Sequence, residues 1–455
     1  MRSPRATDKQ TAEQTNLMAL AILAILGGAA AGAVGALFRL SLVHADRLRG
    51  DLVAWAHGVG LAGFLILTTT CSAATAIASL LVRRYSPFSS GSGITHVEAV
   101  LAGELAQARF RLIPLKFFGG VPAIGAGLAL GPEGPSVQMG ASVAHLVGKL
   151  FRRDWKDCRV LLGACAGAGF AAAFSAPIAG AVFVLEELVG HFETRIAVAA
   201  LGASAAAIWL GSVIVGGSPV FHIEPLSPSR FGTAPCYLVL GVLMGLLGVV
   251  YNSTIKGAVV VGHRLAWLPV EVRAAIIGAG AGMLGWFMPG LIGSGEAITQ
   301  HALGGGGALG IIPLIFLFRL GFGAVSYASG APGGLLAPML VLGSQVGLFV
   351  GTITSLAFPR LGIQPVAFAV VGMAAFFTAV ARTPLTSIIL VTEMTGSSAV
   401  LLPMLMACFV AMQVPTMLGG APLYETLRAR TLKIQESITA GGGARQDQHQ
   451  PRDAA

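Results

Sequence analysis

The chain has 455 residues, of which 11% are charged and 55% are hydrophobic, and a further 62 are glycines. A soluble globular protein carries about 25% charged residues, so this chain has too few to cover a surface that faces water. The composition excludes a soluble enzyme, an intrinsically disordered chain and a disulfide-rich scaffold, and it predicts a polytopic membrane protein.

The net charge of +9 lies in clusters that flank apolar segments. Lysine and arginine beside membrane segments are typical of cytoplasmic loops, so we predict that both termini are cytoplasmic. No nucleic-acid-binding module accompanies the clusters, and we expect no nucleic-acid partner. The clusters are Arg2 to Lys9, Lys149 to Arg159 and Arg428 to Lys433.

The apolar segments divide the chain into two membrane halves. Leu17 to Phe38 runs for 22 residues without a charge, and a helix of this length, about 33 Å, crosses a bilayer. Four prolines between residues 219 and 235 predict a non-helical linker. We expect a polar cytoplasmic N-terminus over 1–16, a first half over 17–217, a linker over 218–235, a second half over 236–427, and a basic, disordered cytoplasmic tail over 428–455.

Glycine and proline interrupt the apolar segments, and the interruptions recur in the same order in both halves. An interrupted helix must line protein or a cavity in the membrane, so we predict half-helices. Paired interruptions in two halves are typical of transporters that bind substrate near mid-membrane. The repeated features are Gly-Ser-Gly at 91–93 and 293–295, breaks at 131–135 and 330–334, and proline nine residues before Glu186 and Glu393.

Half-helices that begin inside the membrane favour an anion as the substrate. Their first turns present free N–H groups and about half a positive charge. Glu133 lies at one such start, and a carboxylate in an apolar segment is typical of an ion or proton pathway. We predict that Glu133 competes with the anion for these N–H groups. A purely structural glutamate at a helix start is the alternative.

Other polar residues give more ambiguous signals. Glu186 and Glu187 follow an uncharged run, and neighbours on an α-helix point about 100° apart, so one can be buried and relay protons. An ordinary pair of helix-end glutamates is the alternative. We expect Glu393 to be a packed structural carboxyl. Tyr424 follows the last apolar segment, where tyrosine often belongs to the interfacial belt.

Metal and enzyme motifs are missing from the chain. The nine histidines have no metal-ligand spacing, and the five cysteines are widely spread. No HExxH, CxxC, GxSxG or phosphate-binding loop occurs. We therefore expect no metal, no cofactor and no enzymatic activity.

Four motifs resemble those of the CLC family of chloride channels and chloride/proton antiporters, and the likeness runs from about Leu17 to Leu432. The resemblance implies an all-α polytopic fold of about eighteen helices in two inverted-topology halves with broken helices. It also implies a homodimer with a pore in each subunit, of the prokaryotic type without CBS domains. The motifs are Gly91 to Ile94 (GSGIP in the family), Gly131 to Pro135 (GREGP), Gly333 to Pro338 (GGIFAP) and Pro422 to Tyr424, the segment of the pore tyrosine.

The resemblance also implies roles for the residues at matching positions. Ser92 and Tyr424 would donate hydroxyls to a central chloride. The backbone N–H groups of Leu335 and Leu336 would complete the chloride site. Two departures from the motifs concern the pore: Pro132 replaces the usual arginine, and Thr95-His96 replace Pro-Glu. We expect them to weaken the external anion field and to alter the pH profile.

Two glutamates carry the functional prediction. Glu133 matches the external gating and proton glutamate of the family, and Glu187 matches the internal proton-transfer glutamate, which channels generally lack. We predict a secondary active transporter that exchanges chloride for protons in a bacterial inner membrane. A passive, voltage- or pH-gated chloride channel of the same fold is the main alternative. An intramembrane hydrolase and a cation-coupled transporter of organic solutes have less support.

Overall fold

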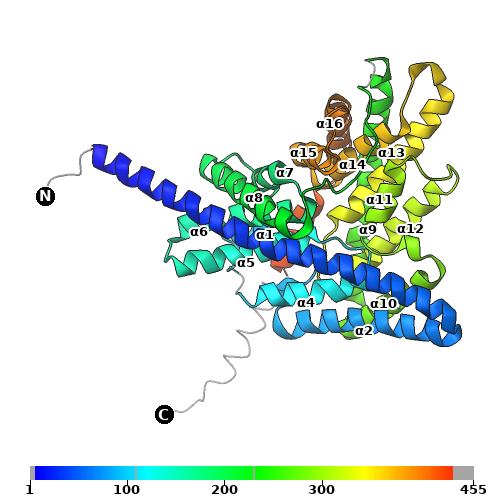
Figure 1. Cartoon of the computed structure of the whole chain (residues 1–455), viewed down its shortest axis with the longest axis horizontal. Helices are drawn as coiled ribbons and strands as arrows, with labels where there is room; N and C mark the ends of the chain where they lie inside the picture. The colour runs from blue at the N-terminus through cyan, green and yellow to red at the C-terminus, as the bar shows by residue number, and fades with distance from the viewer. Residues whose placement is uncertain (1–5, 108–109, 229–230, 434–455) are drawn as a thin grey trace, which may run out of the picture.

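The protein is all-helical throughout the part that the computed structural model describes, residues 6–107, 110–228 and 231–433 (Figure 1). Within these ranges the only β-type pairing is two isolated bridges, Gly91 with Pro332 and Gly131 with Gly334. Sixteen numbered α-helices and a further helical stretch over 423–433 come close to the expected eighteen. Residues 1–5 of the predicted N-terminal segment and 434–455 of the predicted tail lie outside the described residues.

In the described residues of the first half there are eight α-helices and one π-helix. They are α1 (Ala6–Val59), α2 (Leu61–Tyr85), α3 (Ile94–Leu101), α4 (Leu112–Gly125), α5 (Glu133–Leu150), α6 (Trp155–Phe174), α7 (Pro177–Phe183), the π-helix η2 (Val184–Val189) and α8 (Thr194–Val215). The second half contains α9 (Ala234–Arg264), α10 (Val270–Phe287), α11 (Glu296–Leu303), α12 (Ile312–Ala328), α13 (Leu336–Ala357), α14 (Pro365–Ala381), α15 (Pro384–Thr395) and α16 (Leu401–Met417).

The predicted interruptions are helix boundaries, which confirms the broken helices. Helices α5 and α13 begin at the breaks near 131–135 and 330–334, and α7 and α15 begin at prolines. Proline suits a helix start because the first N–H groups of a helix have no intrahelical acceptor. The helices before α7 and α15 end at Phe174 and Ala381. The next residues, Ser175 and Arg382, are both in the left-handed conformation, with φ of 54° and 68°.

The two halves repeat each other in three dimensions as well as in sequence. Helix α5 packs on α6, and α13 packs on α14. Gly140 and Gly343 hold the same place in these pairs, 203 residues apart. A Cβ at Gly343 would lie 2.5 Å from the Gly372 carbonyl oxygen, and one at Gly140 would overlap the Cys165 carbonyl oxygen. Small residues therefore let both helix pairs pack closely, as in membrane interiors.

The outer surface is that of a multi-pass membrane protein. Among the described residues, seven helices are long and apolar enough to cross a membrane. Large apolar side chains such as Trp209 and Val213 on α8 are more than 70% exposed, as lipid contact requires. Helix α1 is much longer than the predicted span of 17–38: the sequence from Arg39 to Val59 contains no proline, so the helix continues past the apolar segment (Figure 1).

Candidate anion and proton site

Three glycine-rich turns meet in the interior and hold one another through main-chain hydrogen bonds. Gly131 N–H donates to the Gly334 carbonyl oxygen at 2.9 Å, and Gly334 N–H donates back to Gly131 at 2.8 Å. Gly333 N–H donates to the Gly91 carbonyl oxygen at 3.1 Å. The half-helix starts of both halves, far apart in sequence, thus form one connected centre.

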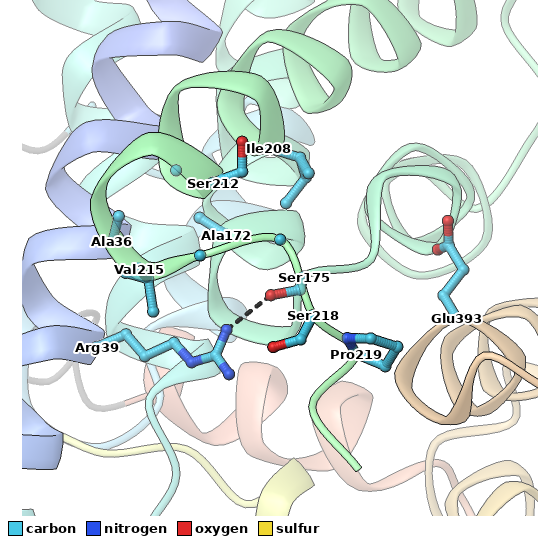
Figure 2. A pocket seen from close by; sticks show the side chains of 13 residues that line it. Ala36, Arg39, Ala172, Ser175, Ile208, Ser212, Val215, Ser218, Pro219 and Glu393 are labelled. Carbon is cyan, nitrogen blue, oxygen red and sulfur yellow. Dashed lines mark hydrogen bonds between the residues drawn. The ribbon is translucent and has the colours of Figure 1, made fainter. Parts of the chain in front are cut away.

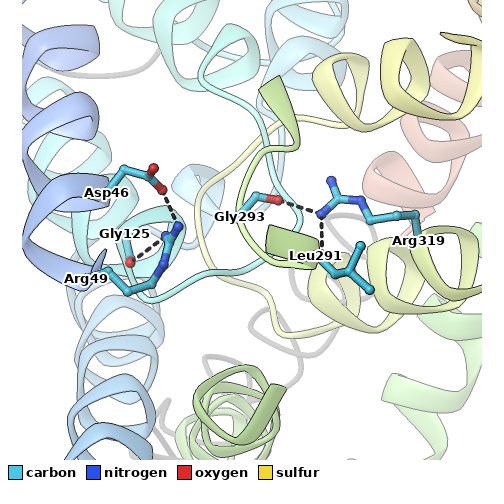
Figure 3. A network of polar contacts seen from close by, with 6 residues as sticks. All are labelled: Asp46, Arg49, Gly125, Leu291, Gly293 and Arg319. Carbon is cyan, nitrogen blue, oxygen red and sulfur yellow. Dashed lines mark hydrogen bonds and ion pairs between the residues drawn. The ribbon is translucent and has the colours of Figure 1, made fainter. Parts of the chain in front are cut away.

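A buried basic side chain holds the Gly-Ser-Gly turn in each half. Lys116 on α4 is fully buried, and its Nζ donates to the carbonyl oxygens of Gly91 at 2.6 Å and Ser92 at 3.3 Å. Arg319 on α12 is 203 residues later and donates to Gly293 at 2.8 Å and to neighbouring carbonyl oxygens (Figure 3). Because these side chains donate hydrogen bonds to the turn carbonyls, each turn has a fixed orientation. The sequence pattern did not predict a role for Lys116 or Arg319.

The Glu133 carboxylate occupies the place where the turns meet. It is fully buried, and its Oε1 accepts a hydrogen bond from the Leu336 N–H at 2.7 Å. Its other oxygen has no partner among the described residues. A Cβ at Gly131 or Gly334 would overlap the carboxylate, so glycine at both positions leaves room for the carboxylate in this place. A carboxylate therefore sits on an N–H group that was predicted to bind the anion.

Ser92 borders the same centre, and Tyr424 is close to it. Ser92 is 1% exposed, and a Cβ at Gly134, next to Glu133, would lie 2.6 Å from its Oγ. Tyr424 is fully buried, and its hydroxyl has no hydrogen-bond partner in the described part of the chain. It lies within electrostatic range of both Glu133 and Glu187. The buried hydroxyl disagrees with an interfacial-belt tyrosine, because belt tyrosines keep their hydroxyl groups at the water interface.

Glu187 lies apart from the turns, on a π-helix that the sequence did not predict. Its carboxyl group lies beside that of Glu98 on α3, which is 5% exposed, and the two interact electrostatically. Two neighbouring carboxyl groups can form a hydrogen bond only when one of them carries a proton. The sequence pattern did not predict a role for Glu98, because only the packing of α3 on the π-helix brings it beside Glu187.

Glu186 and Glu187 were predicted to point in different directions, and Glu186 has different partners from Glu187. The Glu186 carboxylate accepts the N–H groups of Leu385 at 3.0 Å and Thr386 at 2.6 Å, at the start of α15. Glu393 on α15 makes the reciprocal contact with Ile178 at 3.0 Å and Ala179 on α7 at 2.8 Å. These two glutamates cap helices of the opposite half, which fits the structural role expected of Glu393.

The described residues contain no cluster of three or more His, Cys, Asp or Glu side chains suited to a metal. The five cysteines are free thiols, and three of them are buried. The chemistry of the centre is therefore that of N–H groups, hydroxyls and carboxyls. These features define a polytopic helical membrane protein whose half-helices converge on a buried carboxylate.

Known proteins share this sequence and arrangement. The family profile described as "Voltage gated chloride channel" matches residues 74–416. The H(+)/Cl(-) exchange transporter ClcA of Vibrio cholerae is 37% identical over 420 residues, which cover 91% of this chain and 90% of that protein. ClcA of Cronobacter sakazakii is 36% identical over 438 residues, covering 92% and 91%. The chain belongs to the voltage-gated chloride channel family.

Solved structures have the same fold. A slow cyanobacterial Cl-/H+ antiporter superposes with a TM-score of 0.88 at 30% identity, over 92% of this chain and 99% of that one. A CLC-type fluoride/proton antiporter superposes with a TM-score of 0.74 at 24% identity, over 90% and 97%. The predicted fold, with its broken helices, is confirmed.

Proposed function

We propose that this protein is a secondary active transporter that exchanges chloride for protons. The proposal rests mainly on the hydrogen bond that the Leu336 N–H donates to the Glu133 carboxylate. The carboxylate is an anion, and the same N–H group suits a free anion such as chloride equally well. The relatives named as H(+)/Cl(-) exchange transporters support this reading. They are named as transporters, which agrees with a protein that is not an enzyme.

The outer step is an exchange of anions at one place. Chloride would bind the N–H groups of Leu335 and Leu336 and the hydroxyls of Ser92 and Tyr424. Ionised Glu133 competes for the Leu336 N–H group, whereas protonated Glu133 has lost the charge that holds it there. Chloride binding thus favours uptake of a proton by Glu133, which links the two fluxes.

The inner step is a proton transfer at the Glu187–Glu98 pair. The two neighbouring carboxyl groups would share one proton, and Glu187 is within electrostatic range of Tyr424, which is in range of Glu133. We place the proton path between Glu187 and Glu133, with Glu98 as the partner that keeps a proton on the inner glutamate.

The surroundings of the exchanger are also part of the proposal. We infer a homodimer with one pathway in each subunit, located in a bacterial inner membrane with both termini cytoplasmic. The basic cluster after α5 supports this orientation. The division into 17–217, 218–235 and 236–427 agrees with helices α8 and α9, which end at Val215 and begin at Ala234.

The experiment is parallel measurement of chloride and proton flux in proteoliposomes. An imposed chloride gradient should drive protons uphill, and the proton flux should vanish when chloride is replaced by an impermeant anion. Chloride flux without coupled proton movement at every pH would favour the channel alternative and overturn exchange.

A further inference from the structure

An open cavity of about 290 Å³ lies directly in front of the glycine-rich centre. Pro132, the neighbour of Glu133, lines it from one side, and Glu296 at the start of α11 lines it from another. Its remaining charged lining comes from one stretch of α1: Arg39, Asp46, Arg47 and Arg49. The cavity therefore has a charged lining and reaches the residue next to the buried carboxylate, Pro132.

The length of α1 places this cavity at the outer mouth of the pathway. About 20 helical residues cross the hydrocarbon core, so a helix that enters at Leu17 reaches the opposite face near Arg39. With the N-terminus in the cytoplasm, as proposed above, Arg39 to Arg49 lie on the outer side. Pro132 itself contributes no charge there.

Two of the three arginines form no ion pair among the described residues. Arg49 pairs with Asp46 and also donates to the Gly125 carbonyl oxygen at 3.1 Å (Figure 3). Arg39 donates to the neutral Ser175 hydroxyl at 2.7 Å, in an adjoining cavity of about 220 Å³ (Figure 2). Arg47 is exposed.

The opposing charge in the cavity is Glu296. It is exposed, and it lies within electrostatic range of both Arg39 and Glu133. The residues that line the cavity include three arginines and two carboxylates, Asp46 and Glu296, so the lining has a formal net charge of +1. A concave mouth with low-dielectric walls concentrates the field of such a charge and attracts small anions.

We propose that this cavity is an external chloride-binding antechamber, in which Arg39 and Arg47 hold the ion and Glu296 opposes it. The proposal rests on the proposed function. The α1 arginines supply the attraction that an uncharged residue at 132 cannot. The antechamber delivers chloride to the Leu335 and Leu336 N–H groups as Glu133 leaves them.

The first test is chloride uptake into right-side-out membrane vesicles at low ionic strength, as a function of external chloride. One charge a few ångströms from the ion in a partly aqueous site changes affinity about 3- to 5-fold. Arg39→Gln and Arg47→Gln should raise the half-saturating chloride concentration by that factor, and Glu296→Gln should lower it. All three differences should shrink when an impermeant salt is added outside.

Arg360→Gln is the matched control. Arg360 follows α13, the inverted counterpart of α5, so it faces the outer side, and it is exposed without lining the cavity. The half-saturating chloride concentration of the Arg360→Gln variant should equal that of the unmodified protein. Unchanged values in both Arg39→Gln and Arg47→Gln, or a shift of Glu296→Gln in the same direction as theirs, would overturn the antechamber.

Bromide-soaked crystals separate this site from the exchange activity. Anomalous density beside Arg39 and Arg47 in the unmodified protein, lost in the Arg39→Gln/Arg47→Gln double variant, is the expected result. An empty cavity would overturn the antechamber even in a protein that exchanges normally. Bromide in the cavity of a protein without coupled flux would overturn the proposed function alone.

Discussion

Glu133 and Leu336 hold equivalent positions in the two halves, 203 residues apart, and the carboxylate of the first accepts the N–H of the second at 2.7 Å. The inverted repeat thus brings two helix N-termini to one point, and one of them supplies a side chain that behaves as an anion toward the other. A free anion that takes the same N–H must displace the side chain. In the proposed mechanism, the coupling of chloride to protons follows from this competition.

Glu133→Gln should abolish proton coupling while chloride flux persists. The amide has nearly the shape of the protonated acid, but it carries no proton to exchange and no charge to compete with chloride. Parallel chloride and proton flux in proteoliposomes measures the effect. Proton coupling at the unmodified ratio would contradict the role given to Glu133.

Glu187→Gln and Glu98→Gln should both reduce proton flux at least 10-fold and leave chloride flux within about 2-fold, because each removes one of the two neighbouring carboxyl groups. Glu224→Gln is the control, since this glutamate is exposed in the linker. Full proton flux in Glu98→Gln, with loss in Glu187→Gln, would show that Glu187 works without its partner.

Gly334→Ala should weaken coupling without unfolding the protein. Its Cβ would overlap the Glu133 carboxylate and force it from the Leu336 N–H. The backbone at 334 is not left-handed, and the nearest backbone atom to the added Cβ, the Gly134 nitrogen, lies 3.0 Å away. We expect a several-fold lower proton-to-chloride ratio. Gly280→Ala on α10, whose Cβ would meet open space, serves as the control. Equal ratios in the two variants would refute the steric argument.

Glu393→Gln should lower stability without affecting coupling. It removes the charge that receives the Ile178 and Ala179 N–H groups, a loss of about 1 kcal/mol for a partly exposed helix cap. Thermal unfolding in detergent should begin at a lower temperature than in the unmodified protein, and the flux ratio should be unchanged. An altered ratio with unaltered stability would assign Glu393 to the proton pathway instead.

The sequence predicted the features that are local in the chain. Breaks at Gly-Pro motifs, the repeat and the lone carboxylate Glu133 can be read from spacing and polarity alone. The partner of Glu133 could not, because it is a main-chain N–H group that only folding brings near. Lys116 and Arg319 were overlooked because their acceptors are carbonyl oxygens, which no side-chain pattern reveals.

The π-helix at Val184–Val189 shows a second limit. Adjacent glutamates on an ordinary helix were expected to point about 100° apart, and Glu186 and Glu187 do have different partners. A π-helix as short as this one, however, does not change the spacing of hydrophobic residues enough to be recognised in the sequence. Glu98, which pairs with Glu187, becomes recognisable only once α3 and η2 are seen to pack together.

Halide binding in Glu133→Gln tests the central claim most directly. Crystals of this variant and of the unmodified protein, soaked in bromide under the same conditions, would be compared for anomalous density at the Leu336 N–H. The account predicts bromide within hydrogen-bonding distance of that group in the variant and the Glu133 carboxylate there in the unmodified protein. Absence of bromide at Leu336 in the variant would contradict the competition between carboxylate and anion.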